Sequence, residues 1–297
     1  MVVAATGFFD GVHKGHRKVL EKLCEIAKRT GKKSAVITFW PHPRSVLQQG
    51  ADGLRLLNSL EEKKELIRSI GINKFIVIPF SKEFSLLSTD EFLQKFLKDK
   101  YEVSSLIIGY DHRLGHNTGE SQEEFINKAE NIGISVERVD EFSVGEKTVS
   151  STKIRALLAQ GQIEKANSYL GYYYPLKGVV ISGKKLGRKL GFPTANMGVY
   201  EPLKAIPSNG VYGVKVKVLN KCYYGICNIG LRPTVGEHST ITIETFILDF
   251  NEDIYGLDIN LEFIYKIRDE LKFKDLDSLI LQMKKDEECA RAFFIKH

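Results

Sequence analysis

The stretch that decides how the first half of this chain folds is Gly7-Phe8-Phe9-Asp10-Gly11-Val12-His13-Lys14-Gly15-His16. It follows residues 2–5, an apolar run typical of a buried strand, and it leads into residues 15–29, where apolar side chains recur at helical spacing. A strand that turns directly into a helix leaves free backbone amides at the helix N-terminus. Those amides and the helix dipole favour an anion such as phosphate.

His13 and His16 stand three residues apart, so their imidazoles can project to one side of the first helical turn. An imidazole can donate a hydrogen bond to a phosphate oxygen, and it adds positive charge if its pKa allows. Taken alone, the motif also fits an ordinary turn with two solvated histidines. A zinc site is disfavoured, because no third and fourth ligand stand at a suitable spacing.

The composition is that of a globular protein long enough for two domains: 297 residues, 43% hydrophobic and 27% charged. The net charge of +6 suits anionic small substrates and is weak support for nucleic-acid binding. The four cysteines form no CxxC pair, which favours a reducing compartment. There is no signal-like segment and no apolar run of the ~20 residues that a membrane helix needs. We therefore expect a cytoplasmic protein that binds neither membrane nor nucleic acid.

The first half alternates apolar strands with helices, which predicts an α/β domain with a doubly wound, Rossmann-like parallel sheet. Strands are expected at 2–6, 34–39, 74–78, 105–108 and 135–139. Helix starts are marked by three capping boxes (Ser59/Glu62, Ser88/Glu91 and Ser121/Glu124), and two helix ends by Gly71 and Gly133. In such sheets ligands gather at the carboxyl ends of the strands, where residues 7–16 and 109–119 would lie.

The second half has a different character, with strands separated by turns rich in Gly, Asn and Pro. Strands are expected at 179–182, 211–219, 222–229, 240–249 and 259–264, and an amphipathic helix at 276–294. This pattern predicts an antiparallel β-barrel closed by one helix. The change falls near residues 170–174, so the expected domains are 1–171 and 172–297.

A second motif in the first half is Ser150-Ser151-Thr152-Lys153-Ile154-Arg155. Hydroxyl residues at a helix start are usually caps, and they also leave amides free for an anion. Arg155, one turn in, could pair with a phosphate through two hydrogen bonds. In combination with the His-x-Gly-His turn on a parallel sheet, the motif indicates transfer of a nucleotidyl group.

These motifs together resemble the bacterial bifunctional riboflavin kinase/FAD synthetase family. The first half carries the nucleotidyltransferase motifs, and segments 38–43 and 109–113 resemble the flavin-side loops. In the second half, 183–196 with Pro193-Thr194-Ala195-Asn196 resembles the riboflavin kinase motif, and 228–235 and 267–270 fit further family segments. One departure is His112-Arg113-Leu114-Gly115, where the family usually has Phe-Arg-Phe-Gly, so two aromatic stacking surfaces are lost.

The resemblance implies phosphorylation of riboflavin to FMN with ATP, followed by adenylylation of FMN to FAD with release of pyrophosphate. It implies a monomer or weak homo-oligomer that uses Mg²⁺ and has riboflavin, FMN, FAD and ATP as its small-molecule partners. The catalytic residues it implies are Glu244, His13, His16 and Arg155. For ATP it implies Gly7, Phe9, Asp10, Gly15, Ser151, Thr152, Gly183, Lys185, Gly187 and Gly191; for flavin, His42, Asp111, Arg113 and Arg268; for metal, Thr194 and Asn196.

The residues of the second half support part of this assignment independently. Ile241, Ile243 and Ile247 share one face of an expected strand, so Glu244 points to the other face. A carboxylate there could be the base that a riboflavin hydroxyl needs, although a solvated carboxylate is the commoner meaning of the pattern. Thr194 and Asn196 alternate out of one side of an extended segment, and their oxygens suit Mg²⁺.

Three other functions remain open at this point. Another His-x-Gly-His nucleotidyltransferase, with a phosphopantetheine or cytidylyl acceptor, would leave the barrel half without a role. A class I aminoacyl-tRNA synthetase would need a downstream lysine-rich signature and tRNA-binding domains, neither of which the sequence displays. A flavin-binding regulator that has lost turnover would bind the ligands and form no product.

Overall fold

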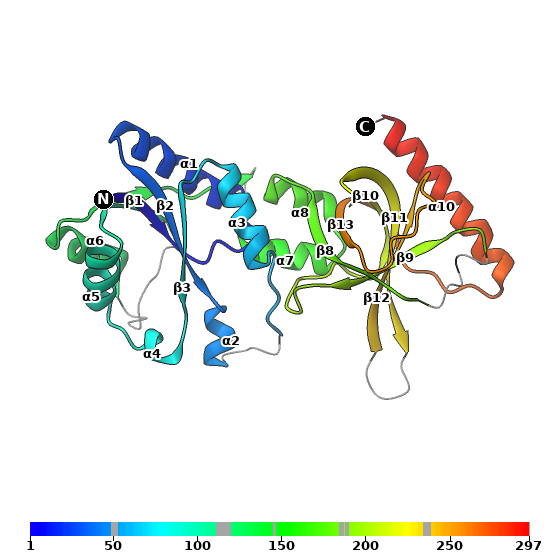
Figure 1. Cartoon of the computed structure of the whole chain (residues 1–297), viewed down its shortest axis with the longest axis horizontal. Coiled ribbons are helices and arrows are strands. Elements are labelled where there is room, and N and C mark those ends of the chain that lie inside the picture. The colour runs from blue at the N-terminus through cyan, green and yellow to red at the C-terminus, as the bar shows by residue number, and fades with distance from the viewer. Residues whose placement is uncertain are drawn as a thin grey trace. The chain divides into compact units, whose positions relative to one another are not determined.

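The computed structural model describes residues 1–48, 53–110, 120–144, 147–183, 187, 190–233 and 239–296. Figure 1 shows the course of the chain from an α/β region to a β-barrel region. The chain divides into two compact units, Met1–Ser151 and Thr152–His297. Both predicted architectures, a parallel sheet with helices and an antiparallel barrel with a C-terminal helix, are confirmed.

The first unit is built on a five-stranded parallel sheet. Its strands, in spatial order, are β3 (Lys74–Pro79), β2 (Lys33–Trp40), β1 (Val2–Thr6), β4 (Val103–Gly109) and β5 (Ser135–Val139). Because β1 is central and its neighbours run parallel to it, the turn that follows Thr6 lies at the carboxyl edge of the sheet, where ligands bind in this architecture.

Helices cover both faces of this sheet (Figure 1). Alternate residues of β1 point to opposite faces: Val3 and Ala5 pack with helices α1 (Lys14–Arg29) and α3 (Leu60–Ser69). Val2 and Ala4 pack with the π-helical segment η2 (Phe92–Lys100) and with α6 (Gln122–Asn131). The strands are apolar on both faces because each face is buried under a helical layer.

The predicted caps are confirmed. Capping boxes with both reciprocal hydrogen bonds open α3, α5 (Thr89–Glu91) and α6. Gly71 and Gly133 follow helix ends with φ of 99° and 75°, a conformation that glycine adopts without steric cost. The shorter elements of the unit are α2 (Pro43–Leu47), α4 (Lys82–Ser85), β6 (Ser143–Val144) and β7 (Lys147–Thr148).

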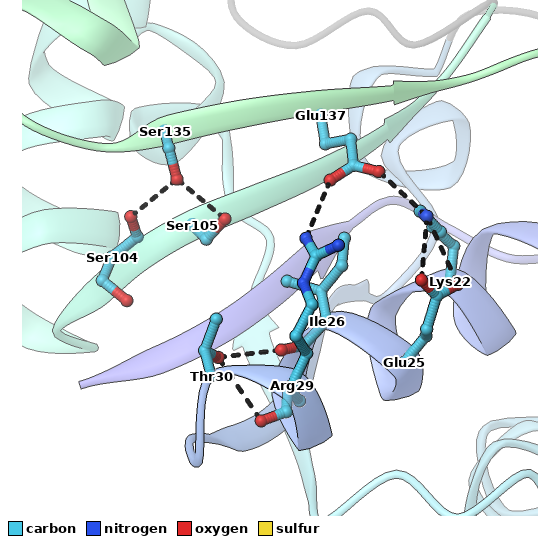
Figure 2. A network of polar contacts seen from close by, with 10 residues as sticks. Lys22, Glu25, Ile26, Arg29, Thr30, Ser104, Ser105, Ser135 and Glu137 are labelled. Atoms are coloured by element: carbon cyan, nitrogen blue, oxygen red, sulfur yellow. Dashed lines mark hydrogen bonds and ion pairs between the residues drawn. The ribbon is translucent and has the colours of Figure 1, made fainter.

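Polar contacts tie the C-terminal part of α1 to the sheet. The carboxylate of Glu137, on β5, forms ion pairs with Lys22 and Arg29 of α1 (Figure 2). Its oxygens lie 3.2 Å from the Lys22 ammonium and 3.9 Å from the Arg29 guanidinium. The Thr30 hydroxyl, just beyond α1, donates to the carbonyl of Ile26 at 2.8 Å. These exposed ion pairs are individually weak, and they lie at the end of α1 opposite His13. Most of the fixation of α1 therefore comes from its buried apolar face.

The second unit is a closed six-stranded antiparallel barrel. Its strands, in spatial order, are β10 (Gly210–Val218), β11 (Lys221–Pro233), β12 (Ser239–Ile247), β9 (Thr194–Val199), β8 (Tyr174–Ile181) and β13 (Asp258–Arg268). Helices α7 (Ser151–Ala159) and α8 (Ile163–Leu170) precede the barrel, and α10 (Leu276–Lys296) follows it. The sequence did not predict β9 as a strand, although it predicted an extended segment there.

Alternation along the strands decides which side chains leave the barrel interior. On β12, Ile243, Thr245 and Ile247 are buried, and Glu244, between them, is only partly buried on the opposite face. The predicted orientation of Glu244 away from the isoleucine face is thus confirmed. Helix α8 is fixed to the barrel by Asn167, whose amide group donates to the carbonyl of Phe263 at 2.8 Å.

Candidate active sites

The turn after β1 has a strained backbone. Phe9 and Val12 have positive φ values of 50° and 36°, and Gly11, between them, has 84°. Positive φ is a genuine outlier for a β-branched residue such as valine, and each such residue costs about 1–3 kcal/mol. Burial of both the Phe9 and Val12 side chains keeps the turn in this shape. The chain thereby enters α1 directly from the sheet edge.

His13 and His16 form a stacked pair at the start of α1. His13 is the N-cap residue, and its Nδ1 accepts a hydrogen bond from the His16 amide at 3.2 Å. The two rings lie 3.6 Å apart, centroid to centroid. A Cβ at Gly15 would come within 3.2 Å of the His13 ring, so a larger residue would require a small shift of that ring. The predicted projection of both imidazoles to one side is confirmed.

Burial makes these histidines poor bases. It lowers the pKa of His13 from 6.5 to about 4. The pKa of His16 is lowered well below its usual value by burial, and further by the charges of His13 and Lys63. Both rings are therefore neutral at pH 7. With Nδ1 of His13 accepting, the proton of that ring is on Nε2, where it can serve as a hydrogen-bond donor.

Asp10 joins the turn to two other segments. Its buried carboxylate accepts hydrogen bonds from the amides of Leu57 at 2.9 Å and Asn58 at 3.3 Å, just before α3. Its carbonyl accepts from the hydroxyl of Ser151 at 2.8 Å. The His-x-Gly-His turn and Ser151 of the second motif are thus in contact, in agreement with the combination of the two motifs in the sequence analysis.

The remaining predicted residues of the first half lie as follows. His42 is the N-cap of α2, and its ring meets the Phe8 ring edge-on with centroids 4.1 Å apart. On α7, the Arg155 guanidinium donates to the Thr152 hydroxyl at 3.3 Å. Asp111, Arg113 and the altered loop around them lie outside the described residues.

Sequence reasoning missed one charged residue close to the turn. Lys63, on α3, is fully buried, and its ammonium lies 3.6 Å from the centroid of the Phe8 ring. The run Glu61-Glu62-Lys63-Lys64 is typical of an exposed helix face, so the sequence itself gave no sign of this burial. Lys63 stands four residues before Ile67, which is buried on the same helix, but this spacing alone does not distinguish a buried lysine from one at the edge of the apolar face.

The second site lies on the outer face of the barrel. Asn196 of β9 and Glu244 of β12 are directly opposite each other in the ladder, and Asn228 of β11 is opposite Glu244 on its other side. Thr194 precedes Asn196 by two residues and so shares its face. The structure thus brings together the predicted base and both predicted metal ligands.

Two glycines of the segment before β9, Gly183 and Gly187, lie close to these residues. A side chain at Gly183 would come within 2.3 Å of the Asn196 amide nitrogen, and one at Gly187 within 3.3 Å of the Thr194 hydroxyl. A Cβ at Gly187 would also stand 2.3 Å from the carbonyl oxygen of Phe192, so neither glycine accepts a side chain without a shift. Gly191 has a φ of 85°, which a glycine adopts readily. Lys185 lies outside the described residues.

A cavity of about 320 Å³ adjoins Thr194 and was not foreseen from the sequence. Its walls are Val180, Pro193, Thr194, Ala195, Ile247 and residues 250–255. The volume suits a flat ring system of a small ligand, and the lining mixes apolar residues with polar ones such as Asn251, Glu252 and Asp253. The segment after β12 has no recognisable motif, which is why sequence reasoning overlooked it.

Both halves of the chain match models of known protein families. Residues 1–153 match the family described as FAD synthetase, and residues 170–294 match the family described as riboflavin kinase. The chain belongs to the bifunctional riboflavin kinase/FMN adenylyltransferase family.

Relatives in this family share most of their length with the chain. The bifunctional riboflavin kinase/FMN adenylyltransferase of Listeria monocytogenes is 39% identical over 99% of this chain and 93% of its own length. The enzyme of the same name from Escherichia coli K12 is 34% identical over 98% and 92%. A crystal structure from Streptococcus pneumoniae, described as a macrolide-efflux protein, is 29% identical, with a TM-score of 0.90 over 98% of this chain and 93% of that one.

Of the residues expected from the riboflavin kinase/FMN adenylyltransferase family, Arg268 has a clear structural task. Its guanidinium makes three hydrogen bonds of 2.7–3.1 Å to Asp286 of α10 and donates to the carbonyl of Asp269 at 3.0 Å. It thereby braces α10 against β13. Within the described ranges, no helix is long and apolar enough to cross a membrane, and no group of three His, Cys, Asp or Glu residues could hold a metal ion.

Proposed function

We propose that this chain makes FAD from riboflavin in two ATP-dependent steps, with residues 1–171 as the FMN adenylyltransferase domain and 172–297 as the riboflavin kinase domain. The observation that carries the proposal is that two separate sets of residues, one after β1 and one on β9 and β12, each fit one of the two phosphoryl chemistries. The separate family matches for the two halves support this division.

In the kinase step, a riboflavin hydroxyl oxygen forms a bond to the γ-phosphorus of ATP, and the bond from that phosphorus to the bridging oxygen of ADP breaks. The hydroxyl must lose its proton, and we assign the acceptor role to Glu244, which lies on an accessible face of the barrel. Asn196 and Asn228 are the partners of Glu244 on the two neighbouring strands, so polar residues lie on both sides of it.

Thr194 and Asn196 fit a magnesium ion. Both carry oxygen atoms on one face of β9, and Gly183 lies close enough to Asn196 that a Cβ there would require a shift. Mg²⁺ prefers such oxygen ligands and keeps waters and ATP phosphates as its other ligands. When bound, the ion would neutralise charge on the transferred phosphoryl group. The adjoining 320 Å³ cavity would receive the adenine of the same ATP.

In the adenylyl step, a phosphate oxygen of FMN forms a bond to the α-phosphorus of ATP, and pyrophosphate leaves. This oxygen is already ionised, so no base is needed, and the neutral state of both histidines agrees with that requirement. His13 and His16 would donate hydrogen bonds to phosphate oxygens alongside the α1 amides. The motif assigns Gly7, Phe9, Asp10, Gly15, Ser151, Thr152 and Arg155 to ATP at this step.

For flavin we retain His42, Asp111, Arg113 and Arg268 as proposed contacts. His42 lies against Phe8, at the same sheet edge as the histidine pair. Because the guanidinium nitrogens of Arg268 are committed to Asp286 and Asp269, its contribution would come from the flat face of the group. We further propose a cytoplasmic location and a monomer or weak homo-oligomer.

The test is a chromatographic time course of the purified protein with riboflavin, ATP and Mg²⁺. We expect FMN to appear first and FAD to follow from it. FMN without FAD would remove adenylyl transfer from the proposal and point to the altered loop at His112–Leu114. Ligand binding with neither product, also with reduced flavin, would favour a flavin-binding regulator.

A further inference from the structure

Lys63 is a buried cation without a hydrogen-bonded partner. Its side chain is 0% exposed, and its ammonium makes no hydrogen bond to any residue that the structure describes. Its ammonium lies 3.6 Å from the centroid of the Phe8 ring and 5.9 Å from that of the Trp40 ring. Fully buried lysines are rare unless they are paired, because removing the charge from water is costly.

A purely structural role would require a carboxylate that depends on Lys63. Asp10 is the acid close enough to stabilise its charge, but the Asp10 carboxylate already accepts two backbone amides, from Leu57 and Asn58. On the same helix, Glu62 closes the capping box with Ser59, and Glu61 pairs with Lys64 at 3.2 Å. Each of these acids is satisfied without a hydrogen bond from Lys63.

The two histidines of the turn before α1, in contrast, bring no positive charge to it, although Lys14 and Arg17 flank them in the sequence. His13 and His16 are neutral at pH 7, so the positive charge expected there from imidazolium is absent. Lys63 is close enough for its charge to disfavour protonation of His16, whose Nδ1 is shielded from water and unpartnered in the described part of the chain. The Lys63 ammonium and the His16 Nδ1 are thus two buried polar groups without hydrogen-bond partners, in the described part of the chain, near the His-x-Gly-His turn.

We propose that Lys63 is a buried cation that binds nucleotide phosphate at the His-x-Gly-His turn, its ammonium exchanging the face of the Phe8 ring for a phosphate oxygen. The ligand class is a nucleoside triphosphate or pyrophosphate. The inference rests on the proposed adenylyl-transfer function of the first unit. It explains why an unpaired charge is kept in a core, since such groups are retained at functional sites at the expense of stability.

The test compares Lys63→Met, which removes the charge at similar volume, with Lys63→Arg and with Lys64→Met. Lys64 is adjacent in sequence and its ion pair with Glu61 is at the surface, so it is the matched control. The single tryptophan of the chain, Trp40, lies near Lys63 and reports ATP or pyrophosphate binding by its fluorescence. FAD formation from supplied FMN gives a second, independent measurement, and FMN formation from riboflavin reports the other unit.

We expect Lys63→Met to weaken ATP and pyrophosphate binding at least ~10-fold and to lower FAD formation ~100-fold, with FMN formation unchanged. Lys63→Arg should retain more of both than Lys63→Met, and Lys64→Met should match the wild type. Because an unpaired buried charge is removed, the thermal midpoint of Lys63→Met should hold or rise.

Normal binding and FAD synthesis by Lys63→Met would overturn the inference and leave the proposed function intact. If Lys63→Met does not fold, Lys63→Arg decides. A Lys63→Arg protein that is stable but inactive would also overturn the inference, because the charge is retained and only the shape of the side chain has changed. A wild-type protein that forms no FAD from FMN would instead contradict the proposed function itself.

Discussion

Asn196 and Glu244 face each other across the antiparallel pair β9 and β12, on the outer face of the barrel. This pairing puts an amide and a carboxylate from segments 48 residues apart side by side, with Gly183 close to the amide. It fixes the relative position of a proton acceptor and a cation ligand through the sheet register, which a one-residue slip would destroy.

Replacing Glu244 with alanine should abolish FMN formation, with a fall of ~10²–10⁴ in rate, because the riboflavin hydroxyl loses its base. FAD formation from supplied FMN should persist. Glu262→Ala is the control, since this carboxylate on β13 pairs with Lys217 in an exposed ion pair. Equal loss of both activities in Glu244→Ala would contradict separate sites.

Replacing His16 with alanine should have the reverse effect. FMN should accumulate from riboflavin while FAD formation falls ~10²–10³-fold, the usual effect of losing one donor to a developing charge. Both products can be followed in one chromatographic assay, so the kinase reaction serves as the internal control for folding. Normal FAD synthesis in His16→Ala would remove this residue from the mechanism.

Placing a methyl group at Gly183 should disturb the kinase site alone. A Cβ there would stand 2.3 Å from the Asn196 amide nitrogen, so the loop or the side chain must move. Gly183→Ala should raise the KM for ATP in FMN formation ~10-fold or more. Gly53→Ala has no atom within 4 Å of the new Cβ and should behave as wild type. An unchanged KM in Gly183→Ala would argue against loop contact with the nucleotide.

The stability of the first unit should fall as the pH drops from 6.5 towards 4. In this window the unfolded chain protonates His13, whereas the folded chain holds its pKa at about 4, so protons favour unfolding. The loss amounts to ~2 kcal/mol at pH 5. His13→Asn keeps an N-cap side chain but does not titrate, so its urea midpoint, followed by Trp40 fluorescence, should depend less on pH. An unaltered pH dependence would show that His13 is not the group responsible.

Breaking the Arg268–Asp286 contact should loosen α10. Asp286→Ala removes a buried carboxylate that accepts three hydrogen bonds from Arg268, and we expect a loss of about 3 kcal/mol in the second unit. Asp249→Ala, which breaks the exposed contact of α10 through Arg291, should cost less than about 1 kcal/mol. Urea unfolding that shows equal losses would mean that burial does not distinguish the two contacts.

Much of the fold could be predicted from local patterns. The capping boxes at Ser59, Ser88 and Ser121 each involve contacts within four consecutive residues, so the sequence alone was enough to predict them. The parallel sheet follows from strands that are apolar on both faces. β9 escaped prediction as a strand because Thr194–Val199 contains small and polar residues and gains its stability from pairing with β8 and β12.

The residues of the candidate sites likewise divide into those that local patterns predict and those that depend on tertiary contacts. The histidine motif and Glu244 could be found from the sequence, since residue type and alternation suffice. Lys63 and the cavity beside residues 250–255 could not, because burial of one lysine and the shape of a loop depend on tertiary contacts. The neutral state of His13 likewise depends on burial, which the sequence does not state.

The most direct test of two independent sites in one chain mixes two inactive variants. Glu244→Ala and His16→Ala are each incubated alone, and then together, with riboflavin, ATP and Mg²⁺. We expect that neither variant alone makes FAD from riboflavin, and that the mixture makes FAD after a lag in which free FMN accumulates. If the mixture forms FMN but no FAD, while Glu244→Ala alone also fails to convert supplied FMN, the assignment of the two reactions to separate sites is contradicted.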